Sequence, residues 1–164
     1  QVLSCKEFDG IYIGASGLMP LQTPSIYEEL SLPTIKKITK MCKEAGVLSE
    51  MHCCGRQRYI VESCYKETNL DCINPLQPPP MGDCDLKEVK EKFGDKLCIK
   101  GNIGETFPML MGTPKDVEEA VITCLDAAKK DGNFILTTEE QIGRDTPYEN
   151  INKMVETCKQ YGKY

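Results

Sequence analysis

The sequence has no cluster of basic residues, no long apolar run, no glycine-rich dinucleotide fingerprint and only one histidine. Its formal net charge is −5 and its Lys and Arg residues are scattered, which argues against nucleic acid or an anionic membrane as a partner. No stretch approaches the about 20 apolar residues of a membrane span. No charged segment followed by an apolar one is visible either, so a signal peptide is not predicted.

The rest of the composition is that of an ordinary globular protein. Of the 164 residues, 40% are hydrophobic and 27% are charged, which is enough to build one core. The chain has no low-complexity tract and no linker, so a single domain spanning residues 1–164 is predicted. Because the first residues read as the last turns of a helix leading into a strand, we expect this domain to be the C-terminal part of a larger protein.

Ten cysteines are many for this length and allow two interpretations. An even number of cysteines could form disulfides in a small secreted domain. A chain of this hydrophobicity does not need disulfides, however, and cysteines inside apolar patterns act as small buried hydrophobes. Those in such patterns are Cys42, Cys64, Cys72, Cys98, Cys124 and Cys158. We therefore predict reduced thiols in a cytoplasmic protein.

Short apolar runs alternate with helical patterns along the chain. The expected strands are residues 10–15, 47–53, 71–75, 97–101 and 134–138. The expected helices are residues 24–46, 57–68, 85–94 and 113–132, and a last helix that starts at Thr146 and Pro147. Asp85 is a candidate N-cap, and Gly46 and Gly94 are candidate C-caps. Five strand–helix units predict an α/β fold with a parallel sheet.

Two architectures fit this alternation, an open doubly wound sheet and part of a (β/α)8 TIM barrel. In a barrel, polar residues at the carboxyl ends of the strands carry the chemistry. The expected strand ends hold Ser16, His52, Cys54, Asn74, Asn102 and Glu140. We predict that Ser16, Asn74 and Asn102 bind substrate. A role in stabilising loops is the alternative for the two asparagines.

Three motifs resemble those of a known family. "HCCG" after one strand, "CIKGNI" at another and "FILTTEEQIGRDTPYENI" near the end are similar to the uroporphyrinogen decarboxylase-like superfamily, and particularly to its cobalamin-dependent methyltransferase branch. The resemblance covers essentially the whole chain. It implies that these residues are the C-terminal five βα units of a TIM barrel enzyme about twice as long, an incomplete barrel on their own.

The resemblance also implies a zinc site. In the methyltransferase branch, the histidine and cysteine of a His-x-Cys motif and a distant cysteine in the last strand loop hold a catalytic zinc ion. Carried over to this sequence, the first two ligands are His52 and Cys54. Glu140 stands where the distant cysteine is expected, so the sequence departs from the family pattern at one ligand of three.

The residues themselves allow a metal site at this place. Side chains two apart in a strand point to the same side, so His52 and Cys54 can face one way while Cys53 faces a helix. Glu140 can complete an open three-ligand zinc site from another strand end. The alternative is a hydrogen-bonded histidine beside buried thiols, with Glu140 on the surface and no metal. If a metal binds without Glu140, Cys53 is the substitute ligand. Glu139 is predicted to be solvated.

The resemblance implies three functional hypotheses. The first is zinc-assisted methyl transfer between a corrinoid protein carrying a cobamide and a small methyl donor or thiol acceptor. The second is metal-independent decarboxylation of a tetrapyrrole, for which Arg56 and Arg58 are the only nearby cationic groups. The third is a non-catalytic fragment. Because five βα units leave two strand edges unpaired, we expect the chain to associate with an N-terminal half-barrel or with a second copy of itself.

Overall fold

The computed structural model describes residues 3, 7–15 and 22–163, and the predicted substrate residue Ser16 lies outside them. The strands are β1 (Gly10–Ala15), β2 (Leu48–Cys53), β3 (Cys72–Asn74), β4 (Cys98–Ile103) and β5 (Phe134–Thr138). The helices are α1 (Pro24–Ile26), η2 (Tyr27–Ser31), α2 (Leu32–Ala45), α3 (Arg58–Glu67), α4 (Leu86–Phe93), η3 (Glu105–Leu110), α5 (Pro114–Ala128) and α6 (Tyr148–Tyr161). Within these ranges no helix is both long and apolar enough to cross a lipid bilayer.

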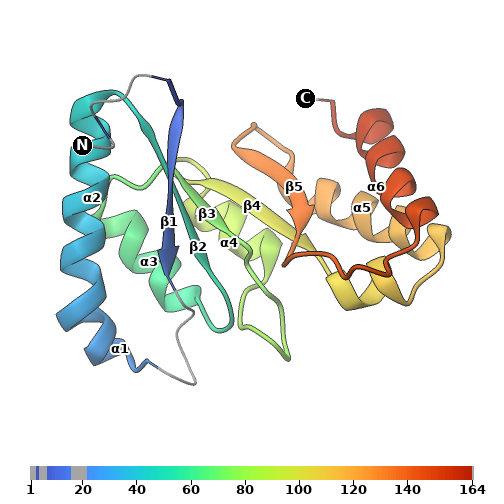
Figure 1. Cartoon of the computed structure of the whole chain (residues 1–164), viewed down its shortest axis with the longest axis horizontal. Helices are drawn as coiled ribbons and strands as arrows, with labels where there is room; N and C mark the ends of the chain where they lie inside the picture. Colours follow the sequence, from blue (N-terminus) through green and yellow to red (C-terminus); the bar gives the residue numbers. More distant parts are fainter. Residues whose placement is uncertain (1–2, 4–6, 16–21, 164) are drawn as a thin grey trace.

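The five strands form one parallel sheet in the order β1-β2-β3-β4-β5 (Figure 1). In a doubly wound sheet the strand order reverses at a switch point, whereas consecutive strands of a barrel lie side by side in chain order. The observed order therefore selects the partial barrel of the two architectures. The α/β fold class predicted from the sequence is confirmed.

The strand and helix ends agree with the sequence within a few residues. The main difference is β4, which extends to Ile103 and so includes Asn102 instead of ending before it. The predicted caps are present: Asp85 accepts a hydrogen bond from the Glu88 N–H at 2.8 Å, and Gly46 ends α2 with a φ of 70°. These caps set the first residue of α4 and the last residue of α2.

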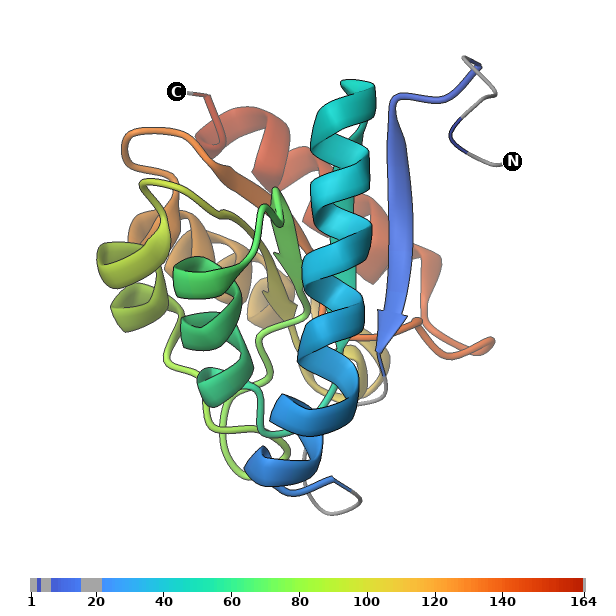
Figure 2. The ribbon, with the colours of Figure 1, turned by 90° about the vertical axis from the view of Figure 1, so that its left-hand side faces the viewer.

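The helices gather on one face of the sheet, and Figure 2 shows α2, α3 and α4 side by side along it. Strand residues that point toward them, such as Met51, Cys53 and Ile99, have no exposed surface. Residues of the opposite face are open, with 59% of Tyr12 and 61% of Leu48 exposed. The sheet thus has a buried outer face and an accessible inner face, as expected of a barrel wall.

The cysteines of the helices are packing residues. Cys42, Cys64 and Cys124 are buried free thiols on α2, α3 and α5. Cys72 and Cys98 lie opposite each other on β3 and β4 and are also free thiols. Cys42, Cys64 and Cys124 thus serve as small apolar side chains, whereas Cys72 and Cys98 line a pocket on the inner face of the sheet. The reduced state of the thiols stays a prediction.

Candidate metal centre

The "HCCG" run forms the carboxyl end of β2 and the turn that follows it. Cys54 comes directly after the strand, and Gly55 then turns the chain with a φ of 75°, a value that favours glycine. The Gly55 N–H donates to Gln77 Oε1 at 2.6 Å. Asp83 accepts from two backbone N–H groups at the start of α3, at 2.8 and 3.0 Å. The sequence therefore fixes Cys54 at the rim of the sheet, with α3 leading away from it.

Glu140 reaches the same rim from the end of β5. The Glu139 N–H donates to the Ile103 carbonyl at 2.8 Å, which carries the ladder between β4 and β5 one residue past the strand. The Thr138 hydroxyl then donates to the Glu140 carbonyl at 2.8 Å and holds the turn. The chain bends at Glu139 and Glu140, directly after β5.

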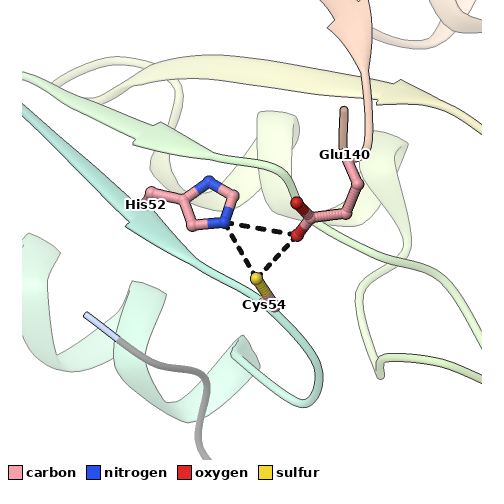
Figure 3. A group of neighbouring side chains, drawn as sticks. All are labelled: His52, Cys54 and Glu140. Carbon is pink, nitrogen blue, oxygen red and sulfur yellow. Dashed lines mark hydrogen bonds and ion pairs between the residues drawn. The ribbon is translucent and has the colours of Figure 1, made fainter. Parts of the chain in front are cut away.

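The side chains of His52, Cys54 and Glu140 point toward one another (Figure 3). The distances are 2.8 Å from His52 Nε2 to Cys54 Sγ, 2.6 Å from Cys54 Sγ to Glu140 Oε1 and 3.2 Å from His52 Nε2 to Glu140 Oε1. The group joins β2 to the end of β5 across 86 residues of sequence. These three side chains can together hold a metal ion, and all three are partly buried.

The donor set suits zinc in an open site. Imidazole nitrogen, thiolate sulfur and carboxylate oxygen are the ordinary protein ligands of zinc, and three of them leave one tetrahedral position free. Zinc bond lengths imply that ligand atoms lie about 3.3 to 3.6 Å apart. The distance of 3.2 Å between His52 Nε2 and Glu140 Oε1 is close to that value, whereas the two distances to Cys54 Sγ are shorter. Cys54 Sγ would therefore have to move outward to admit the ion.

Without a metal ion, Cys54 is in the protonated form, which cannot serve as a metal ligand. Burial, followed by the hydrogen bond to Glu140 and its negative charge, raises the pKa of the Cys54 thiol to about 12. The thiol is then protonated at neutral pH and donates to Glu140 Oε1. A divalent ion reverses the preference, because ligation requires the thiolate. We therefore expect metal binding to release the Cys54 proton.

A pocket of about 430 Å³ opens beside the metal group on the inner face of the sheet. Its lining includes His52, Glu140, Tyr12, Lys100 and Thr137. The volume lies in the range of small-molecule sites. The arrangement so far is a three-ligand metal centre at the carboxyl rim of a partial barrel, with room for a small substrate next to it.

Comparison with known proteins places the chain in a family. The model of the uroporphyrinogen decarboxylase (URO-D) family matches residues 17–161. The chain belongs to this family. A curated relative, the methylcobamide:CoM methyltransferase MtbA of Methanosarcina mazei, is 33% identical over 135 residues, which are 82% of this chain and 37% of the relative. The protein of the same name from Methanosarcina acetivorans is 32% identical over the same share of each chain.

A solved structure shares the family fold. A methyltransferase from Methanosarcina mazei superposes with a TM-score of 0.72 at 16% identity, over 93% of this chain and 42% of that one. The chain spans 37% of the length of the curated relatives it matches. This uroporphyrinogen decarboxylase family member is thus similar in sequence to corrinoid methyltransferases along their shared part.

In this family member the predicted substrate residues contact protein groups. Asn74 is only 4% exposed, and its side chain lies between His52 and Glu50. Asn102 Nδ2 donates to the Leu76 carbonyl at 2.8 Å, and Asn102 Oδ1 accepts from Cys124 Sγ at 3.5 Å. Substrate contacts of both asparagines stay predictions, and Ser16 lies outside the described residues.

Glu139 differs from expectation. The sequence predicts a solvated side chain, but Glu139 is only 9% exposed. Burial, followed by the negative charge of Glu105, raises the pKa of its carboxyl group to about 7, although Gln77 donates a hydrogen bond to it. The Glu139 N–H still pairs with Ile103 of β4, so the side chain stays packed near Gln77 and Glu105 instead of reaching solvent.

We expect the raised pKa of Glu139 to make stability depend on pH. The folded-state pKa of about 7 exceeds the ordinary value of 4.5, so between these values the folded chain binds a proton that the unfolded chain has lost. The free energy of unfolding should therefore fall by about 2 kcal/mol as the pH rises from 4.5 to 7. Urea titrations of chelator-treated protein measure this. Glu139→Gln should remove the trend, and an unchanged slope in that variant would assign it to another group.

Proposed function

We propose that this chain carries the metal centre of a corrinoid-dependent methyltransferase, with His52, Cys54 and Glu140 as zinc ligands. The observation that carries the proposal is the convergence of three ligand atoms from two distant segments, all within 3.2 Å of one another. The names of the two Methanosarcina relatives support the reaction class. Under this proposal a small methyl donor or thiol acceptor exchanges a methyl group with a cobamide held by a corrinoid protein.

The residues of the chain would act as follows. Zinc bound here would supply Lewis acidity, which lowers the pKa of a substrate thiol or polarises the oxygen of a methyl donor. Cys54 and Glu140 each carry one negative charge once Cys54 is ionised, and so balance a divalent ion as two thiolates would. Because the Glu140 oxygen is a harder ligand than sulfur, it leaves the ion more electrophilic than a second thiolate would. The pocket lined by Tyr12 and Thr137 would receive the substrate.

The partners of this site follow from its position. The metal group lies at the carboxyl rim of the strands, so a corrinoid protein would dock over that rim. The exposed inner face, with Tyr12 and Leu48, requires cover by an N-terminal half-barrel or by a second copy of the chain. We propose the half-barrel, and hence that residues 1–164 are the C-terminal part of the active protein. The free thiols of the core suit a cytoplasmic location.

Tetrapyrrole decarboxylation, the reaction after which the family is named, has less support from this site. Gripping several carboxylates requires free cationic groups near the substrate. Arg58 forms two hydrogen bonds with the Glu88 carboxylate, and Lys100 pairs with Glu50 at 2.6 Å. Both cations are therefore already occupied by carboxylates of the chain, and of the two arginines named from the sequence only Arg56 forms no ion pair with a described residue.

Two measurements test the proposal. Purified chain should bind about one zinc ion, and the full-length gene product should consume methylcobalamin in the presence of a thiol. His52→Ala should abolish both. Cys53→Ala is the matched control, because Cys53 is the neighbouring cysteine but faces the helices. The proposal would be rejected if metal-free protein, prepared with a chelator, decarboxylated a porphyrinogen. It would also be rejected if His52→Ala transferred methyl groups at the wild-type rate.

A further inference from the structure

A chain of short hydrogen bonds leads from the metal group into the inner face of the sheet. His52 Nδ1 lies 2.6 Å from Asn74 Oδ1, Asn74 Nδ2 donates to Glu50 Oε1 at 2.5 Å, and Lys100 Nζ contacts the same Glu50 oxygen at 2.6 Å. The residues come from β2, β3 and β4. His52 and Asn74 occupy paired positions of β2 and β3, so the sheet itself sets their distance.

In each hydrogen bond of this series, the donor and the acceptor can be assigned. The ionised Glu50 carboxylate, paired with Lys100, can only accept hydrogen bonds, so the group of Asn74 that faces it must be the NH2. The amide oxygen of Asn74 then faces His52 and can only accept. His52 must therefore donate from Nδ1. When the imidazole is neutral, this leaves the lone pair of Nε2 on the side of Cys54 and Glu140. The Tyr12 hydroxyl also lies near Asn74, but a hydroxyl can donate or accept and sets no direction.

We propose that Asn74 is a positioning residue that fixes the tautomer and ring orientation of His52, and that the Glu50–Lys100 ion pair fixes Asn74. A histidine that ligates through one nitrogen is commonly oriented by a hydrogen bond from the other, and such partners change metal affinity by about 10- to 100-fold. Asn74 is 4% exposed, so water does not compete for its amide. The inference deepens the proposed function, since it rests on His52 as a ligand, but its first test requires no metal.

The single histidine makes that test direct, because ¹⁵N-histidine labelling yields the spectrum of His52 alone. Glu140 Oε1 lies 3.2 Å from Nε2 and competes for the ring proton, so the measurement uses Glu140→Ala with chelator at alkaline pH. We expect a protonated Nδ1 and an unprotonated Nε2. In Asn74→Leu made in the same background the proton should move to Nε2, the site that the neutral histidine side chain prefers in water. A protonated Nε2 with Asn74 intact would overturn the inference.

The second test is zinc affinity in chains that keep all three ligands. Asn74→Leu should weaken binding by about 10- to 100-fold. Glu50→Gln leaves every ligand and Asn74 in place but lets the amide turn over, so it should weaken binding in the same direction and mix the two tautomers. Thr137→Val is the control, because Thr137 lines the same pocket outside the hydrogen-bond chain. Wild-type affinity in Glu50→Gln would overturn the role of the ion pair, even if Asn74→Leu fails to fold.

The two proposals fail in different ways. A chain with the expected Nδ1 proton but no zinc affinity would reject the metal centre and keep the role of Asn74. A chain that binds zinc through His52 with wild-type affinity in both Asn74→Leu and Glu50→Gln would keep the metal centre and reject the positioning role.

Discussion

Replacement of Glu140 by alanine is expected to weaken zinc binding by about a hundred-fold or more. Zinc-finger peptides with four ligands bind zinc with about 10 to 16 kcal/mol, so one ligand corresponds to about 3 kcal/mol. We expect Glu140→Ala to lose this whole contribution to the binding free energy, because Glu140 is the only ligand of the group that follows β5. Competition titrations with a chromophoric chelator measure the affinity.

The neighbouring residue provides the control. Glu139→Gln removes a carboxylate that is adjacent in sequence but faces Gln77 and Glu105, so it should leave zinc affinity within a few fold of wild type. If Glu140→Ala binds zinc as tightly as wild type while His52→Ala does not, the third ligand is another group. Cys53, which the sequence offers as the substitute, would then have to turn away from the helices.

The second large effect concerns the sheet. Met51→Ala is expected to lower the free energy of unfolding by about 4 kcal/mol, because Met51 has no exposed surface and lies in the core between sheet and helices. The truncated side chain loses its transfer free energy and leaves a cavity in close-packed surroundings. Urea denaturation followed by circular dichroism gives the change directly.

Leu48→Ala is the matched substitution on the same strand. Leu48 is 61% exposed on the inner face, so its loss should change the stability of this chain by less than about 0.5 kcal/mol. Equal destabilisation by both variants would contradict a sheet that is buried on one side only. A larger cost of Leu48→Ala in the full-length protein would indicate that a further part of the barrel covers this face.

The sequence predicted the five strands and the neighbouring positions of His52 and Cys54 because both depend on short-range pattern. The alternation of apolar runs with capped helices identifies the strands, and residues two apart in a strand share a face, which places Cys54 beside His52. The third ligand, Glu140, came from a family resemblance, since nothing local to "TTEEQ" distinguishes it from Glu139. Geometry separated the two, with one carboxylate on the rim and the other buried.

The hydrogen-bond chain behind His52 escaped the sequence for a different reason. Glu50 is two residues before His52 on β2, so alternation puts both side chains on the same face. Its partners Asn74 and Lys100 lie on two other strands, however, and their match depends on the register between strands. No local pattern encodes that register in a parallel sheet whose strands are joined by helices. From the sequence alone, the position of Asn74 at a strand end therefore predicts only a substrate-binding role.

The separation of the ligands has a mechanical consequence. A single ion would bind β2 through His52 and Cys54 and the end of β5 through Glu140. It would therefore cross-link these two strand ends and fix the curvature of the sheet between them. The free energy of unfolding would then rise with the concentration of free zinc. The gain would be about 2.7 kcal/mol when that concentration is a hundred times the dissociation constant.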